Sequence, residues 1–239
     1  MILLADIIQL SMGKIFTNCD MGECLTPNPD TKIMPLIDMA SIACGGHAGD
    51  DASMIETILL AKKNNTIIGA HPSYADKGNF GRFSLDMSKQ ALYDLLSAQL
   101  QHFQNLCKNN NATLSYIKPH GALYHDMMKK PEVMQVIIDV VNEIDNNLDL
   151  VVQAGDDKYL KNFGKNANDH FLHEVFADRA YDGLQMLPRD KKGSVFNDEN
   201  LIIEQFEHFL NEKSYKIDTI CFHSDNPASV KALEMLKNA

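Results

Sequence analysis

The sequence has 239 residues, of which 45% are hydrophobic and 23% are charged, so it is not that of a disordered chain and fits one large or two small soluble domains. Lysine and arginine number 22 against 32 aspartate and glutamate, a formal net charge of −10. This charge disfavours binding to nucleic acids and anionic membranes, although a few local cations can still bind a small anion in a cleft. No apolar run reaches the ~18 residues of a membrane-spanning helix.

Cysteine usage and the start of the chain give expectations about location and boundaries. The five cysteines form no Cys-x-x-Cys pair, which argues against a secreted disulfide scaffold or a zinc ribbon and favours the cytoplasm. The apolar stretch at the start of the chain is short and no basic residue precedes it, so it makes a poor signal peptide. Because Met12 lies just before the first predicted strand, residues 1–11 are expected to be an N-terminal extension or leader. Residues 12–239 then form a single domain, since no linker or repeat divides them.

The first half of the chain alternates between short apolar strands and amphipathic helices. Strands are predicted at 15–18, 39–44 and 66–70. Helices are predicted from Asp50 or Asp51 to Asn64, and from Ser88 to about Lys108.

The second half repeats this alternation. Strands are predicted at 114–118, 148–153, 173–177 and 218–222, and helices at 131–143, from 157, at 201–210 and after Pro227. Seven strands, most of them followed by a helix, indicate an α/β protein with a parallel sheet and helices outside it. We therefore predict a single-domain (β/α)₇ barrel, closed or nearly closed.

Polar residues gather where the predicted strands end. The candidates, taken strand by strand, are Asp20 and Glu23, His47 and Asp50, His71, Lys118 and His120, Asp178 and Arg179, and His223 and Asp225. The carboxyl ends of parallel strands form one rim, where barrel enzymes carry their active sites. A single histidine at a strand end is usually a structural residue, but four at one rim favour a functional site.

These residue types suit several kinds of chemistry. Close carboxylates at Asp20 and Glu23 can form an acid/base pair, or they can cap local structure. His47, His71 and His120 can move protons near neutral pH, or hold a divalent metal with Asp20, although no His-x-x-x-His or His-Glu-x-x-His motif is present.

Cationic side chains are candidates for contacts with a carboxylate or phosphate. They are Arg82, Lys118, Arg179 and Arg189, with a solvated surface role expected for Arg189 and a structural ion pair as the alternative for Lys118. The sequence has neither a P-loop nor a Gly-x-Ser-x-Gly elbow. Cys44 lies near His47, but a cysteine that ends an apolar strand is usually a buried hydrophobe rather than a nucleophile.

Six segments in order resemble the LamB/YcsF family over residues 17 to about 228. They are NCDMGE at 18–23, SIACGGHAGD at 41–50, IGAHPSYADKGNFGR at 68–82, IKPHGALYH at 117–125, EVFADRAYDGLQMLPR at 174–189 and ICFHSDNPAS at 220–229. The resemblance implies a (β/α)₇ barrel of the glycoside hydrolase/deacetylase class, in agreement with the strand count.

The resemblance also implies an activity: the ATP-dependent opening of 5-oxo-L-proline to L-glutamate, together with partner subunits B and C. ATP is then a co-substrate. The implied catalytic residues are Asp20, Glu23, His47, His71, Lys118 and His120, and the implied substrate-binding residues are Asp50, Arg82, Asp178, Arg179, His223 and Asp225.

The sequence departs from the family pattern at a few positions. Gly46 replaces the usual phenylalanine, Phe83 a second arginine and Ser224 a glycine, and an unusual CLTPNPD loop follows Glu23. Two alternatives therefore stand beside the lactam-opening enzyme. One is a metal-dependent carbohydrate deacetylase, suggested by fold class. The other is a non-catalytic substrate-binding or regulatory subunit.

Overall fold

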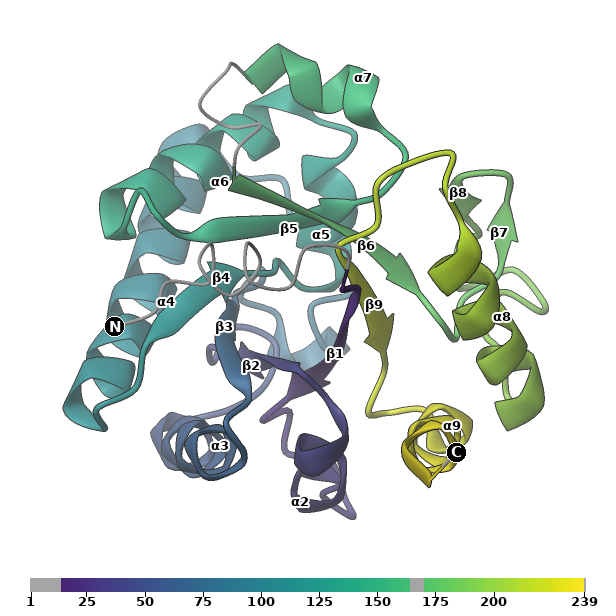
Figure 1. Ribbon diagram of the computed structural model, residues 1–239. Coiled ribbons are helices and arrows are strands. Elements are labelled where there is room, and N and C mark those ends of the chain that lie inside the picture. Colours follow the sequence, from purple (N-terminus) through teal and green to yellow (C-terminus); the bar gives the residue numbers. More distant parts are fainter. Residues whose placement is uncertain (1–13, 164–169, 239) are drawn as a thin grey trace.

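Seven parallel strands form a closed barrel, which confirms the predicted fold class (Figure 1). The structure is a computed structural model that describes residues 14–163 and 170–238. The predicted N-terminal extension, residues 1–11, lies outside the described residues. The barrel closes because the first strand pairs with both the second and the last, so that Asn18 has partners on either side, Met39 and Cys221.

The barrel strands lie around the sheet in the order of the chain. They are β1 (Phe16–Met21), β2 (Met39–Ala43), β3 (Ile67–His71), β4 (Leu114–Ile117), β5 (Asp149–Gln153), β6 (Phe171–Phe176) and β9 (Thr219–Phe222). Every neighbouring pair is parallel, as the helical crossovers require.

Helices surround this barrel (Figure 1). They are α2 (Asp30–Ile33), α3 (Asp51–Asn64), α4 (Lys89–Asn109), α5 (Gly121–Met127), α6 (Pro131–Ile144), α7 (Asp157–Leu160), α8 (Glu199–Asn211) and α9 (Pro227–Asn238). Short 3₁₀ turns, η1 (Met34–Leu36), η2 (Lys77–Asn79) and η3 (Lys161–Phe163), complete the connections. In the described residues no helix is long and apolar enough to cross a membrane.

Two predicted helix starts are confirmed by their hydrogen bonds. The Asp50 carboxylate accepts from Ser53 N at 2.9 Å, and the Ser53 hydroxyl accepts from Asp50 N, so both orphan donors at the start of α3 are satisfied. The Ser88 hydroxyl accepts from Ala91 N at the start of α4.

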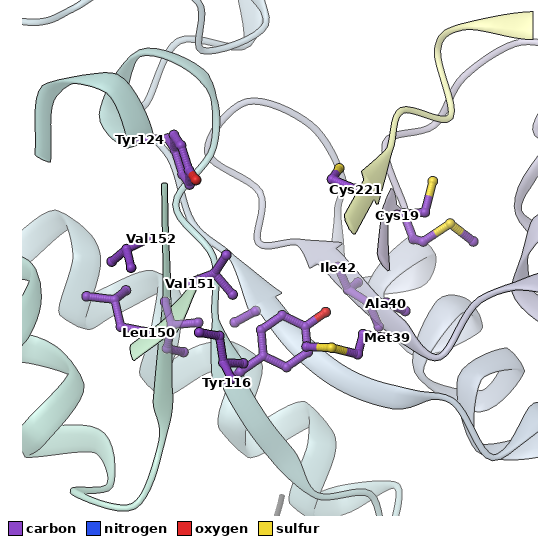
Figure 2. Packing of buried hydrophobic residues seen from close by; sticks show 14 of the residues in the cluster. Cys19, Met39, Ala40, Ile42, Tyr116, Tyr124, Leu150, Val151, Val152 and Cys221 are labelled. Atoms are coloured by element: carbon purple, nitrogen blue, oxygen red, sulfur yellow. The ribbon is translucent and has the colours of Figure 1, made fainter. Parts of the chain in front are cut away.

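The barrel interior is filled by side chains, with Tyr116 among the largest. Figure 2 shows Tyr116 pointing across the barrel beside Met39. Its hydroxyl lies 3.1 Å from Ser41 Oγ, and its ring lies against Gly69, where an added Cβ would come within 2.2 Å of ring atoms. The absence of a side chain at Gly69 therefore leaves space for the Tyr116 ring, which fills this part of the barrel interior.

The structure differs from the sequence predictions in three places. Strand β1 extends to Met21, so Asp20 lies inside the strand and not after it. The buried Asp20 carboxylate is compensated there by the Lys118 ammonium. His71 is likewise the last residue of β3. Helix α5 and the hairpin of β7 (Tyr181–Asp182) and β8 (Gln185–Met186) were not predicted, because both are too short for a clear hydrophobic period.

Candidate active site

A cavity of about 510 Å³ opens at the carboxyl ends of the barrel strands. Most of the residues singled out in the sequence line it: Asp20, Glu23, His71, Arg82, Lys118, His120, Arg179, His223 and Asp225. Arg189, expected at the surface, also lines the cavity. The barrel brings these side chains together because their strands run in parallel and end at one rim.

Three of the predicted site residues do not line the cavity. Asp50 is exposed and caps α3, so its carboxylate is used locally. His47 and Asp178 are buried behind the cavity wall, each against a residue that does line it. These two side chains are therefore linked to the cavity only through their neighbours, His120 and His223.

Lys118 lies at the floor of the cavity inside a cage of polar groups. Its ammonium donates to Asp20 Oδ1 at 2.8 Å, to Asn18 Oδ1 at 3.1 Å and to Cys221 Sγ at 3.1 Å, and it lies 3.0 Å from Glu174 Oε1. Burial by itself would lower the Lys118 pKa, but Asp20, Cys221 and Glu174 raise it well above its usual value. The ammonium is therefore permanently charged and holds two carboxylates in place.

Asp20 links this cage to the histidines. Its second oxygen, Oδ2, lies 3.4 Å from His71 Nε2. Burial favours the neutral acid, yet His71 and Lys118 together hold the Asp20 pKa well below its usual range. Asp20 is thus an ionised carboxylate at neutral pH and cannot donate a proton there.

His71 and His120 form a chain of hydrogen bonds that ends on backbone carbonyls. His71 Nδ1 donates to Lys118 O at 2.6 Å, and His120 Nε2 donates to Phe80 O at 2.9 Å. The remaining nitrogens, His71 Nε2 and His120 Nδ1, lie 2.9 Å apart. Burial and the nearby His71 lower the His120 pKa well below its usual value.

Glu23 has the opposite character to Asp20. Burial, together with the charges of Asp20 and Asp225, raises the Glu23 pKa well above its usual value. Its Oε1 lies 3.1 Å from His47 Nε2, and burial, with His120 and His71 nearby, lowers the His47 pKa. The pKa shifts of the two carboxylates therefore run in opposite directions, so Glu23, which lines the cavity, keeps its proton to higher pH than Asp20.

The same residues form a set of metal-ligand type. One donor atom from each of Glu23, His47, His71 and His120 lies within 4.8 Å of the others. Nitrogen and oxygen donors in this number suit Zn²⁺. The His47 and His120 rings, however, stack in parallel with centroids 3.6 Å apart, so an ion shared by both cannot lie in the planes of both rings. One ring would have to turn to bind it.

The rim carries three arginines with different partners. Arg82 donates to Asp225 Oδ2 at 2.8 Å, and Arg189 lies 3.7 Å from Asp225 Oδ1. Arg179 instead donates to the carbonyls of Ser194 and Leu187, and so fixes the loop that contains the β7–β8 hairpin. Arg82 and Arg189 are therefore the guanidinium groups that a ligand anion can reach by displacing Asp225.

The family model described as the LamB/YcsF family matches residues 15–239. The chain belongs to this family. The A subunit of 5-oxoprolinase from Vibrio cholerae serotype O1 is 37% identical over 244 residues, which cover 96% of this chain and 99% of that relative. The second of the 5-oxoprolinase A subunits from Pseudomonas putida is 36% identical over 95% of this chain and 93% of that relative.

Solved structures share the fold of this LamB/YcsF chain. The lactam utilization protein from Thermus thermophilus superposes with a TM-score of 0.81 and 28% identity, over 94% of this chain and 96% of that one. A GH113 β-1,4-mannanase superposes with a TM-score of 0.51 at 10% identity, over 88% of each chain, which shows a shared barrel fold alone.

Several residues at or beneath the cavity of this LamB/YcsF chain were not predicted from the sequence. Glu174 is fully buried on β6 and pairs with Lys118, and Asn18 on β1 donates to the Glu174 carboxylate at 2.9 Å. His125 of α5 lines the cavity, where burial, with Arg179 and Lys129 nearby, lowers its pKa to about 4. The sequence signal for the Glu174–Lys118 pair was a glutamate within the buried strand 171–176, because a buried charge needs a partner.

Cys44 is not placed as a nucleophile. Its thiol is buried and donates to Ile42 O at 3.3 Å, and burial raises its pKa far above the ordinary value. A thiol held in this protonated form behaves as a small buried hydrophobe, in agreement with the expectation from the sequence.

Proposed function

We propose that this chain is the A subunit of an ATP-dependent 5-oxoprolinase, which opens 5-oxo-L-proline to L-glutamate together with subunits B and C. The names of full-length relatives support the assignment. The observation in the site that carries it is a single cavity lined by two carboxylates, Asp20 and Glu23, whose pKa values are shifted in opposite directions, down for Asp20 and up for Glu23. This is the arrangement that general acid/base chemistry on an amide requires.

The chemistry of the substrate explains the need for ATP. A five-membered lactam is a stable amide with a poor leaving group, so phosphorylation of its oxygen makes the ring carbon easier to attack by water. ATP is thus a co-substrate, and in the absence of a P-loop it binds in an atypical site here or on one of the partner subunits. A reducing cytoplasm, where glutamate is used, suits a chain with five free cysteines.

Different side chains of the cavity bind the substrate and transfer protons. Arg82 and Arg189 at the rim receive the substrate carboxylate or a phosphate. Lys118 keeps Asp20 ionised and in position. Glu23, backed by His47, supplies a proton to the ring nitrogen as its bond to the carbonyl carbon breaks.

Reconstitution tests the proposal directly. The purified chain is mixed with purified B and C subunits, and glutamate and ADP are measured with and without 5-oxo-L-proline. We expect both products only in the complete mixture with substrate, and a Glu23→Gln variant should lower kcat by about 10²-fold or more. Equal activity of B and C without this chain, or a fully active Glu23→Gln protein, would contradict it.

A second candidate function rests on the set of Glu23, His47, His71 and His120. If the set holds Zn²⁺, a metal-dependent deacetylase becomes the better assignment. Metal analysis of the purified chain and an assay with acetylated sugars separate the two. Stoichiometric zinc with release of acetate favours the deacetylase, and metal-free turnover of 5-oxo-L-proline favours the lactam-opening enzyme. A third outcome favours a non-catalytic role. In that outcome the chain binds substrate, and the complex that contains its Glu23→Gln variant stays fully active.

A further inference from the structure

His223 forms a hydrogen-bonded pair with a carboxylate that lies behind it. The residue follows β9, and its ring lines the cavity with 15% of the side chain exposed. Its Nδ1 lies 2.7 Å from Asp178 Oδ1. Asp178 is fully buried, so this carboxylate reaches a ligand only through the imidazole.

The pair fixes which nitrogen of His223 carries the proton. Although burial favours the neutral acid, His223 and Asn226 lower the Asp178 pKa, so the carboxylate is ionised and accepts. His223 Nδ1 must therefore be the donor. Its Nε2 has no hydrogen-bond partner within residues 14–163 and 170–238. In the neutral ring, Nε2 then carries a lone pair that is available to a ligand or water in the cavity.

The pair is held rigidly from several sides. Asn226 donates to the second oxygen of Asp178 at 3.2 Å and to Phe196 O at 2.8 Å. The Phe176 ring stacks on the imidazole with a centroid separation of 5.4 Å and an interplanar angle of 12°. Such a support fixes both the position and the tautomer of a reacting imidazole.

The other histidines of the site are occupied differently. His71 and His120 both donate to backbone carbonyls and turn their remaining nitrogens toward each other. His47 is buried behind the wall, and the low pKa of His125, about 4, makes it a weak base. His223 differs from these four in combining a carboxylate behind the ring with an open nitrogen in front.

We propose that His223 is the general base of the hydrolytic step and that Asp178 is its positioning residue; this deepens the proposed function and rests on it. With the lactam oxygen phosphorylated by ATP, the ring carbon carries a C=N bond and a C–O–P link. A water oxygen bonds to this carbon, one water proton moves to His223 Nε2, and the C=N π electron pair moves onto the nitrogen, which then takes that proton from the imidazolium. The C–N bond breaks as a carbonyl forms from the new hydroxyl; Glu23 protonates the leaving nitrogen and receives the hydroxyl proton in turn. The acyl phosphate that remains reacts with a second water molecule to give the carboxylate of glutamate and phosphate.

The charges around His223 suit this role. Asp178 approaches from the end of β6, and an Asp20 oxygen, Cys221 Sγ and a His223 ring nitrogen lie within 4.8 Å of one another. Asp225 lies two residues along the chain, where Arg82 and Arg189 neutralise it. The carboxylates stabilise the imidazolium that forms during the attack, and the arginines remain available for the anion of the substrate.

The tautomer is tested without any turnover. In ¹⁵N NMR spectra of the intact chain, the His223 ring signals are those absent from a His223→Asn variant. We expect a protonated Nδ1 and a bare Nε2 in the wild type. An Asp178→Asn substitution, whose amide can donate to Nδ1, should move the proton to Nε2. A wild-type ring with its proton on Nε2 would overturn the proposal.

Activity is tested in the reconstituted complex with folded variants. His223→Asn and His223→Gln should lower kcat by about 10²–10⁴-fold with KM nearly unchanged, and added imidazole should restore part of the loss in His223→Asn. Asp178→Asn should lower kcat with KM nearly unchanged and also move the ring proton to Nε2 in the NMR spectra, which a merely structural role would not do. His102→Asn, which breaks the exposed His102–Asp51 pair at 2.8 Å, is the matched control and should leave kcat unchanged.

The outcomes distinguish failure of the general-base proposal from failure of the proposed function on which it rests. A wild-type complex that does not open 5-oxo-L-proline overturns the proposed function itself. An active wild type with a fully active His223→Asn variant overturns only the general base. A His223→Asn variant with raised KM and unchanged kcat makes His223 a binding residue, and overturns it as well.

Discussion

Lys118 joins two buried carboxylates that would otherwise repel each other. Its ammonium is 2% exposed and touches both Asp20 and Glu174. The loss of one partner from a buried ionic network leaves uncompensated charge, which is strongly destabilising. The structural ion pair that the sequence left as an alternative is therefore present, and it also shapes the site by holding Asp20.

A Lys118→Met substitution should lower the free energy of unfolding by about 3–5 kcal/mol. The measurement is urea unfolding followed by circular dichroism. Adding Glu174→Gln to the same chain should recover part of the loss, because one uncompensated charge is removed. Lys231→Met, which breaks the exposed pair with Glu199, is the control and should unfold like the wild type. A single Lys118→Met variant as stable as the wild type would contradict the role.

His125 makes stability depend on pH in a defined direction. Burial, Arg179 and Lys129 lower its pKa to about 4, while the unfolded chain titrates near ~6.5. The contribution of His125 to the free energy of unfolding is complete above about pH 6.5 and is lost as the pH falls toward 4. In this range the unfolded state binds a proton at His125 that the folded state does not bind. The loss is at most about 3 kcal/mol.

A His125→Gln variant should therefore lose less stability than the wild type between pH 7 and pH 4.5. Urea unfolding at both values measures the difference, and His102→Gln on the exposed face of α4 serves as the control. If the wild type and His125→Gln lose the same free energy of unfolding over this range, His125 is not buried as described.

At the scale of elements, the start of α3 depends on a capping residue, Asp50. Asp50 caps the helix through its reciprocal bonds with Ser53. The family resemblance implied substrate binding by Asp50, but the side chain lies outside the lining of the cavity. Capping of α3, in the turn that leads from β2 into this helix, accounts for an aspartate at position 50.

Asp50→Ala should lower the melting temperature by about 2–4 °C, since the first-turn donor of α3 loses its acceptor. Asp50→Ser keeps a capping oxygen and should melt near the wild type. Differential scanning calorimetry measures both. Equal melting of Asp50→Ala and Asp50→Ser would mean that the side chain does not act as a cap.

At the scale of the whole molecule, stability depends on closure of the barrel by the two ends of the sheet. Strand β9 lies between β1 and β6 and pairs with both. Its removal leaves two unpaired edges and an open interior that contains the Lys118 cage. Unpaired edges of this kind promote aggregation.

A chain that ends at residue 216 should show no cooperative unfolding transition and should aggregate. A chain that begins at Met12 tests the other end: the sequence predicts that it keeps the wild-type melting temperature. Size-exclusion chromatography and calorimetry on both truncations measure this. A soluble, cooperatively melting 1–216 fragment would contradict the dependence on closure.

The sequence by itself determined the seven barrel strands, the barrel class and most of the residues at the rim. These follow from local periods and from where each apolar run stops, which is information carried within a few residues. The tertiary structure decided which rim residues act together. Lys118 meets Cys221 across 103 positions of sequence and Asn18 meets Glu174 across 156, while Asp178 turns behind His223. Local patterns cannot specify such partners, because the distance between two distant side chains exists only once the barrel has closed.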